Sequence, residues 1–174
     1  MKIESYTHQL VELLAYDPRF PRVAATLIEL VQGAAPELRV EHMGSTAVPE
    51  CAGKGVVDLM VLYRPGGLAH ARDVLAHLGF QHQGGTDPFP ESRPMRVGAV
   101  TVEGTTYRAH LHVLEEDSAE SLELLAFRDR LRSDAALRRA YEDEKRAVLG
   151  RGITRGQEYA ECKTGFIRGA LRLP

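Results

Sequence analysis

The stretch from Gly44 to Asp58 carries side chains that could bind a phosphate group and a metal ion. The turn Gly44-Ser45-Thr46 offers hydroxyl groups beside backbone amides, and its glycine lets the backbone approach a ligand closely. Lys54 could supply a positive charge to the same anion, and Asp58 could hold Mg²⁺ against phosphate oxygens. Phosphoryl and nucleotidyl transfer need this combination, because cations must neutralise the negative charge that develops during the reaction.

Two histidines offer further ligands. His110 and His112 are separated by one residue, so on a strand they point to the same face, together with Arg108. With this spacing a strand presents two imidazoles to one metal ion or one phosphate. If that strand lies beside the one that carries Asp58, an Asp/His/His cluster results. Such a cluster suits Zn²⁺, Mn²⁺ or Fe²⁺ better than Mg²⁺.

The strand around Asp58 carries one carboxylate. Alternation places Asp58 and Met60 on the same face, and a two-metal site of the polymerase type needs a second carboxylate where this chain has Met60. With one carboxylate, Mg²⁺ would be held mainly by water and substrate. A carboxylate inside an apolar strand must have a partner, because desolvation of an unpaired charge is costly. That partner is a metal ion, a histidine or Lys54, and a purely structural ion pair with Lys54 is the main alternative to a working site.

Hydrophobic patterns predict the elements that position these residues. Residues 38–43 and 56–63 are short and rich in apolar and β-branched residues, so we expect strands on either side of the glycine-rich loop. A helix is expected to begin at Pro18, with Asp17 as its N-cap, and a second helix is expected over residues 68–78.

The rest of the chain is predicted to form a loop, a hairpin and helices. Residues 81–94 are rich in glycine and proline and predict a mobile or substrate-covering loop. Residues 96–116 predict a hairpin that turns at Glu103-Gly104, and three helical stripes follow Asp117. We therefore expect a mixed sheet followed by a helical cap.

Composition and charge are those of an ordinary soluble protein. The chain of 174 residues has a formal net charge of −2, which gives no strong signal for nucleic-acid binding. We expect one domain over residues 1–174, with a core over residues 17–115 and a helical extension over residues 117–172. The two cysteines lack metal-ligand spacing and are interpreted as reduced thiols. Without a signal peptide or membrane span in the sequence, a cytoplasmic location is expected.

Five segments, taken together, resemble a known family. They read YDPRF, EHMGSTAVPECAGKGVVDLMV, HLHV, AFRDRLRSDAALRRAYEDEK and YAECKTGFI, and they come in the order and spacing of the GrpB family. The resemblance spans nearly the whole chain, and the family is similar to the nucleotidyltransferase superfamily. It implies an α/β (α+β) fold: a nucleotidyltransferase-like mixed β-sheet with packed helices and a C-terminal helical extension.

The resemblance also implies roles for particular residues. The phosphate-binding turn of the superfamily maps to Gly44 and Ser45, and its first metal-binding carboxylate maps to Asp58. Arg128 and Lys163 are candidate anion ligands by family position, although basic residues on amphipathic helices are usually solvated. The sequence departs from the family pattern at Pro49-Glu50-Cys51, where Pro-Gly-Leu is usual, and at Ala109, where a histidine is frequent.

The first hypothesis is a protein that binds a nucleotide or another phosphorylated small molecule. In it Gly44, Ser45, Thr46 and Lys54 hold phosphate, and Asp58 with His110 or His112 holds one divalent cation. Mg²⁺ or Mn²⁺ is expected, with Zn²⁺ as an alternative, and nucleotidyl transfer would depend on Asp58 and His112. A second hypothesis is a non-catalytic accessory or protein-interaction module with a degenerate site, since GrpB-like domains also occur fused to dephospho-CoA kinase. A third is a metal-dependent phosphoester hydrolase.

Overall fold

A five-stranded mixed sheet forms the centre of the computed structural model, which describes residues 2–84 and 88–172. The strand order is β1-β2-β5-β4-β3. Strands β2 and β5 are parallel, and all other neighbours are antiparallel. The strands are β1 (Arg39–Met43), β2 (Val56–Tyr63), β3 (Gln81–His82), β4 (Met95–Val102) and β5 (Thr105–Glu115).

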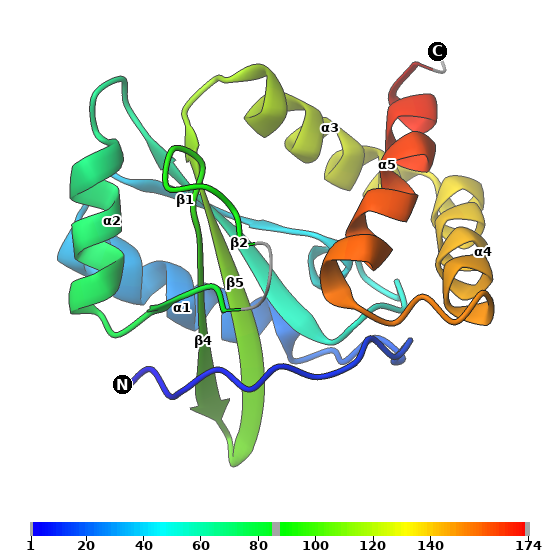
Figure 1. Cartoon of the computed structure of the whole chain (residues 1–174), viewed down its shortest axis with the longest axis horizontal. Coiled ribbons are helices and arrows are strands. Elements are labelled where there is room, and N and C mark those ends of the chain that lie inside the picture. The colour runs from blue at the N-terminus through cyan, green and yellow to red at the C-terminus, as the bar shows by residue number, and fades with distance from the viewer. Residues whose placement is uncertain (1, 85–87, 173–174) are drawn as a thin grey trace.

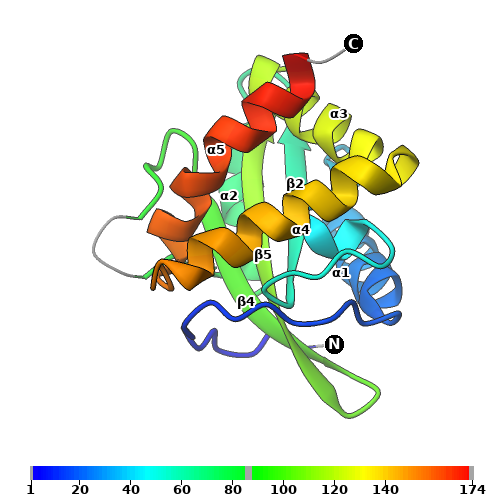
Figure 2. The same ribbon diagram turned by 90° about the vertical axis from the view of Figure 1, so that its right-hand side faces the viewer.

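Helices cover both faces of the sheet (Figure 1). One face packs against α1 (Phe20–Ala34) and α2 (Leu68–His77). The other face carries α3 (Ala119–Ser133), α4 (Ala135–Gly150) and α5 (Gly156–Arg172), which lie in front of the strands in Figure 2. Among the described residues, no helix combines the length and the apolar character needed to cross a membrane.

Side-chain alternation divides the strands between two apolar clusters. Val57, Leu59 and Val61 of β2 belong to the main core, which includes α1 and α2. Met60 lies on the opposite face in a smaller cluster with Met43, Leu62 and Leu114, against Leu124 and Leu125 of α3. The predicted alternation of β2 is therefore confirmed, and Asp58 faces the C-terminal helices.

The segment before α1 is extended and lies across the sheet edge and the helical cap (Figure 1). Glu4 and Ala99 exchange backbone hydrogen bonds of 2.8 and 3.0 Å, and Leu14 and Gly53 exchange bonds of 2.8 and 2.9 Å. Between these two points, the amide of Val11 donates to the carbonyl of Thr154 at 2.8 Å. This N-terminal segment joins β4, the loop before β2 and the α4–α5 connection.

The predicted start of the first helix is wrong. Helix α1 begins at Phe20, and Asp17 is not its N-cap. The Asp17 carboxylate instead accepts the backbone amide of Arg19 at 2.9 Å and also pairs with the Arg19 guanidinium. Asp17 thus stabilises a turn before the helix, and Pro21 takes the proline position in the first helical turn.

The other predicted elements are largely confirmed. The hairpin turns at Glu103-Gly104, where both residues have positive φ, as a two-residue hairpin turn requires. The predicted loop over residues 81–94 begins with a short strand, because Gln81 and His82 pair with β4. Residues 85–87 of that predicted substrate-covering loop lie outside the described residues.

Substitution Met60→Asp should lower the free energy of unfolding by about 3 kcal/mol, because Met60 is fully buried among apolar side chains beneath α3. Urea denaturation would measure the loss. Met60→Leu, which preserves volume and polarity, should cost less than about 1.5 kcal/mol. Wild-type stability in the aspartate variant would show instead that this position accepts a second carboxylate.

Candidate functional site

The parallel pairing of β2 and β5 brings the predicted acid and histidines together. Asp58 lies opposite His110 in the strand register, and Met60 lies opposite His112. The Oδ1 atom of Asp58 is 3.4 Å from Nδ1 of His110 and 3.8 Å from Nε2 of His112. The three ligand atoms all lie within 4.8 Å of one another. Two ligands of one tetrahedral ion, each about 2.1 Å from it, are separated by similar distances.

Asp58 is a buried carboxylate whose Oδ1 atom lacks a well-formed hydrogen bond. Its residue exposure is 8%, and Oδ1 accepts no hydrogen bond from the described residues. The nearest ammonium, Nζ of Lys54, is 3.4 Å away, at ion-pair distance. Burial alone would raise the pKa of Asp58, yet Lys54 and the two histidines hold it well below its usual value. The donor set and the unsatisfied buried oxygen fit a divalent cation.

Both histidines are neutral near pH 7. Burial lowers the pKa of His110 to about 4, and Lys54 adds to this effect. Burial also lowers the pKa of His112. A neutral imidazole has one nitrogen with a free lone pair, which is the form that binds metal or accepts a proton.

Contacts from outside the strands surround the rings of the two histidines. Nζ of Lys54 is 3.3 Å from Nδ1 of His110, and the hydroxyl of Tyr6 is 2.7 Å from Nε2 of the same ring. Nδ1 of His110 thus lies between an ammonium group, which only donates, and the Asp58 carboxylate, which only accepts, and the Tyr6 hydroxyl at Nε2 can take either role. The Arg93 guanidinium only donates, and its Nη1 is 3.4 Å from Nδ1 of His112, which places the proton of that neutral ring on Nε2. In the tautomer with its proton on Nε2, His110 would turn a free lone pair of Nδ1 toward an ion beside Asp58.

The Gly44 turn is shaped by Asp58. Gly44 has φ 71° and ψ −172°, a conformation that side-chain-bearing residues rarely adopt. A Cβ atom at this position would lie 2.7 Å from Oδ2 of Asp58. The glycine is thus needed for the close approach of the turn to the carboxylate, as well as for backbone conformation.

A buried lysine that the sequence analysis did not single out contacts this turn. Lys145 of α4 is 1% exposed, and its Nζ donates to the hydroxyl of Ser45 at 3.2 Å and to the carbonyl of Ala52. Glu142, one turn earlier, accepts the amide of Ala52 at 2.6 Å. Burial lowers the pKa of Lys145. Its helical spacing with the buried Tyr141 is the sequence signal that could have identified it.

A cavity of about 180 Å³ joins the turn, the carboxylate and the helical cap. Of the predicted site residues, those that line it are Gly44, Ser45, Thr46, Lys54, Asp58, His112, Arg128 and Lys163. His110 is not part of this lining, although it contacts Asp58. Phe127, Leu131, Tyr141 and Ile167 contribute an apolar side. The cavity therefore combines a cationic end with an apolar wall.

Lys163 faces this cavity from α5. Its Nζ lies 4.2 Å from the centre of the Tyr159 ring. Burial lowers the pKa of Lys163 to about 7, and the charge of Lys54 adds to the effect. An anion bound beside this amine would favour its charged form, so the position is suited to an anion.

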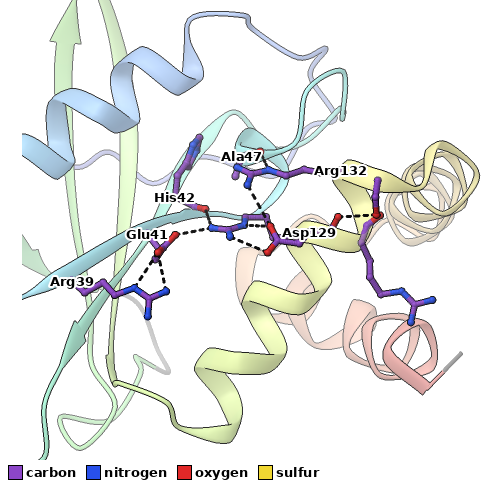
Figure 3. A network of polar contacts seen from close by, with 9 residues as sticks. Arg39, Glu41, His42, Ala47, Asp129 and Arg132 are labelled. Atoms are coloured by element: carbon purple, nitrogen blue, oxygen red, sulfur yellow. Dashed lines mark hydrogen bonds and ion pairs between the residues drawn. The ribbon is translucent and has the colours of Figure 1, made fainter. Parts of the chain in front are cut away.

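Thr46 and Arg128 are engaged within the protein. The Thr46 hydroxyl lies 3.0 Å from Nε2 of His42 and 3.3 Å from the carbonyl of Val56. Arg128 donates to Glu41 at 2.9 Å and to the carbonyl of His42 at 3.0 Å, and it also pairs with Asp129. Figure 3 shows the network around Glu41, His42 and Asp129, between β1 and α3. These contacts indicate that Arg128 fastens α3 to β1 and that Thr46 fastens the turn to β2.

The sequence matches the family model described as GrpB protein over residues 10–172. The chain belongs to the GrpB family. A UPF0157 protein of Streptomyces coelicolor is 31% identical over 141 residues, which cover 79% of this chain and 69% of that relative. A UPF0157 protein of Halalkalibacterium halodurans is 28% identical over 167 residues, which cover 93% of this chain and 81% of that relative.

Solved structures place this GrpB chain in a wider fold group. GrpB from Enterococcus faecalis aligns with a TM-score of 0.67 at 20% identity, covering 91% of this chain and 93% of that one. Cid1, solved in complex with its short product ApU, aligns with a TM-score of 0.53 at 16% identity. That alignment covers 79% of this chain and 43% of the Cid1 chain. The GrpB chain thus has a nucleotidyltransferase-like α/β fold, as predicted.

Substitution Gly44→Ala should destabilise the protein by about 2–4 kcal/mol, because it adds backbone strain and a clash with Asp58. Gly66→Ala is a matched control. Gly66 also has positive φ, but a Cβ there would meet nothing within 4 Å, so only about 1 kcal/mol of backbone strain is expected. Equal losses in chemical denaturation would contradict the close approach to Asp58.

Stability should fall as the pH is lowered from 6.5 to 5. Burial lowers the pKa of His42 and that of His110 to about 4, so the unfolded chain binds protons in this interval while the folded chain does not. Each histidine should account for about 1.5 kcal/mol of the loss. Urea unfolding at several pH values would measure it, and His42→Gln should reduce the slope. A flat profile would show that the two rings take up protons equally in the folded and the unfolded chain.

Proposed function

We propose that this GrpB protein binds a phosphorylated small molecule together with one divalent cation. The observation that carries the proposal is the buried Asp58 Oδ1, which lies 3.4 Å from Nδ1 of His110 at the edge of a cationic cavity. The bound cation would neutralise charge on a phosphate group during transfer. Asp58 and His110 would hold it, and His112 is a second candidate ligand.

Phosphate is proposed to bind at the cationic end of the cavity. Ser45 and Lys54 come from the loop before β2, whereas Lys145 and Lys163 come from the helical cap. Hydroxyl and ammonium groups donate hydrogen bonds to phosphate oxygens. The ligand would therefore lie between the sheet and the cap.

Nucleotidyl transfer is the finer proposal, and His112 is the candidate catalytic histidine, which would accept a proton at Nδ1 in place of its contact with Arg93. The ring is neutral because burial lowers its pKa, and Arg93 and Asp58 fix its orientation. Similarity to Cid1, one structure of which is described in terms of its RNA terminal uridylyl transferase activity, supports a nucleotide as the ligand. The alternative of phosphoester hydrolysis is favoured by the Asp/His/His donor set, which suits a transition metal better than Mg²⁺.

Thermal denaturation with nucleoside triphosphates and Mg²⁺ or Mn²⁺ tests the proposal. A ligand at 100 times its Kd adds about 2.7 kcal/mol of stability, which should raise Tm by about 5–10 °C for a chain of this size. Asp58→Asn should abolish the metal-dependent part of the shift. Asp143→Asn, which makes the same change on an exposed face of α4, should retain it. The proposal fails if no nucleotide or phosphate ester produces a metal-dependent shift in the wild-type protein.

A further inference from the structure

Lys54 lies between two cavities. It lines the 180 Å³ cavity described above and a second cavity of about 190 Å³ under the N-terminal segment, with Glu12 and Arg108 in its wall. The side chain of Lys54 is 29% exposed, so the ammonium group has room on either side.

The ammonium group of Lys54 lies close to both principal metal-ligand candidates. Its Nζ is 3.4 Å from Oδ1 of Asp58 and 3.3 Å from Nδ1 of His110, and those two atoms are themselves 3.4 Å apart. The three atoms form a nearly equilateral triangle. A divalent ion between the carboxylate and the imidazole would face a positive charge at very short range, and the ammonium also lies against the ring nitrogen that the ion would bind.

The backbone around Lys54 is fixed, so only its side chain needs to move. Leu14 and Gly53 exchange two backbone hydrogen bonds beside it, and Arg108 donates to the carbonyl of Lys54 at 3.2 Å. A lysine side chain has four rotatable bonds and moves without disturbing such anchors. An anion bound beside Ser45 and Lys163 would give the displaced ammonium a new partner within the same cavity.

We propose that Lys54 is the built-in cation of the Asp58–His110 pair, and that a divalent metal ion enters by displacing it toward a bound anion. This inference rests on the proposed metal and phosphate site. If the metal ion binds alone, the displaced ammonium group of Lys54 loses its contact with Asp58 and His110. A bound anion gives that ammonium group a new partner. Metal and anion therefore bind cooperatively, and each raises the affinity for the other by the same factor.

Mn²⁺ affinity of the full chain, measured by calorimetry and by the EPR signal of free Mn²⁺, tests the inference. In phosphate-free buffer, Lys54→Met should bind Mn²⁺ about tenfold more tightly than wild type, within the usual range of coupling between sites. Lys163→Met is the control, because it makes the same side-chain change at another lysine that lines the cavity. Among the described residues, Lys163 makes no hydrogen bond or ion pair with Asp58 or His110 and interacts with Asp58 only at longer range, so less than about a threefold change is expected.

Repeating the titrations with millimolar inorganic phosphate completes the test. Phosphate should raise the Mn²⁺ affinity of wild type by a larger factor than that of Lys54→Met. The inference is overturned, with the metal site intact, if wild type binds Mn²⁺ but Lys54→Met binds it no more tightly than Lys163→Met does. If neither wild type nor Lys54→Met binds Mn²⁺, Co²⁺ or Zn²⁺ with or without phosphate, the proposed function fails and the inference fails with it.

Discussion

The burial of one carboxylate on β2, beside the parallel strand β5, constrains the rest of this site. Asp58 remains ionised in an apolar strand only because cationic and imidazole groups surround it. Its Oδ2 atom excludes any side chain at position 44, and its Oδ1 atom requires a partner of opposite charge. The turn, the lysine and the histidine strand are therefore consequences of the same buried charge.

The helical cap completes the cavity by contacting backbone as well as side chains. Glu142 and Lys145, on successive turns of α4, bind the amide and the carbonyl of Ala52. This contact fixes the loop between the Ser45 turn and β2, while Arg128 of α3 fixes β1. Since one wall of the cavity comes from the cap, its shape depends on how α3, α4 and α5 pack on the sheet.

Sequence reasoning predicted the elements whose signals are local. Alternation identified β2 and β5, and one-residue spacing placed His110 and His112 on one face. Sequence reasoning also predicted that the Asp/His/His cluster would form if these two strands were neighbours, and the register shows that they are. The start of α1 was misplaced because Asp17 and Pro18 also suit a turn, and the choice depends on Arg19.

The contacts that sequence reasoning missed join segments far apart in the chain. Tyr6 reaches His110 from the N-terminal segment, and Lys145 reaches Ser45 from α4. Neither residue has a local pattern that specifies its partner, because strand and helix periodicities report which face is buried but not what lies across from it. The pairing of the Arg128 guanidinium with Glu41 was missed for the same reason, since Glu41 lies in β1 and Arg128 in α3.

The balance of charge explains why a site with one carboxylate is chemically coherent. Met60 occupies the position of a second carboxylate and is buried beneath α3. Asp58 is the carboxylate that lines the cavity, together with Lys54 and Lys145. The neighbouring histidines are neutral because burial lowers their pKa values. A divalent cation would leave this end of the cavity strongly positive. A ligand with two or more negative charges, such as a phosphate ester, would compensate that excess, whereas a single carboxylate would not.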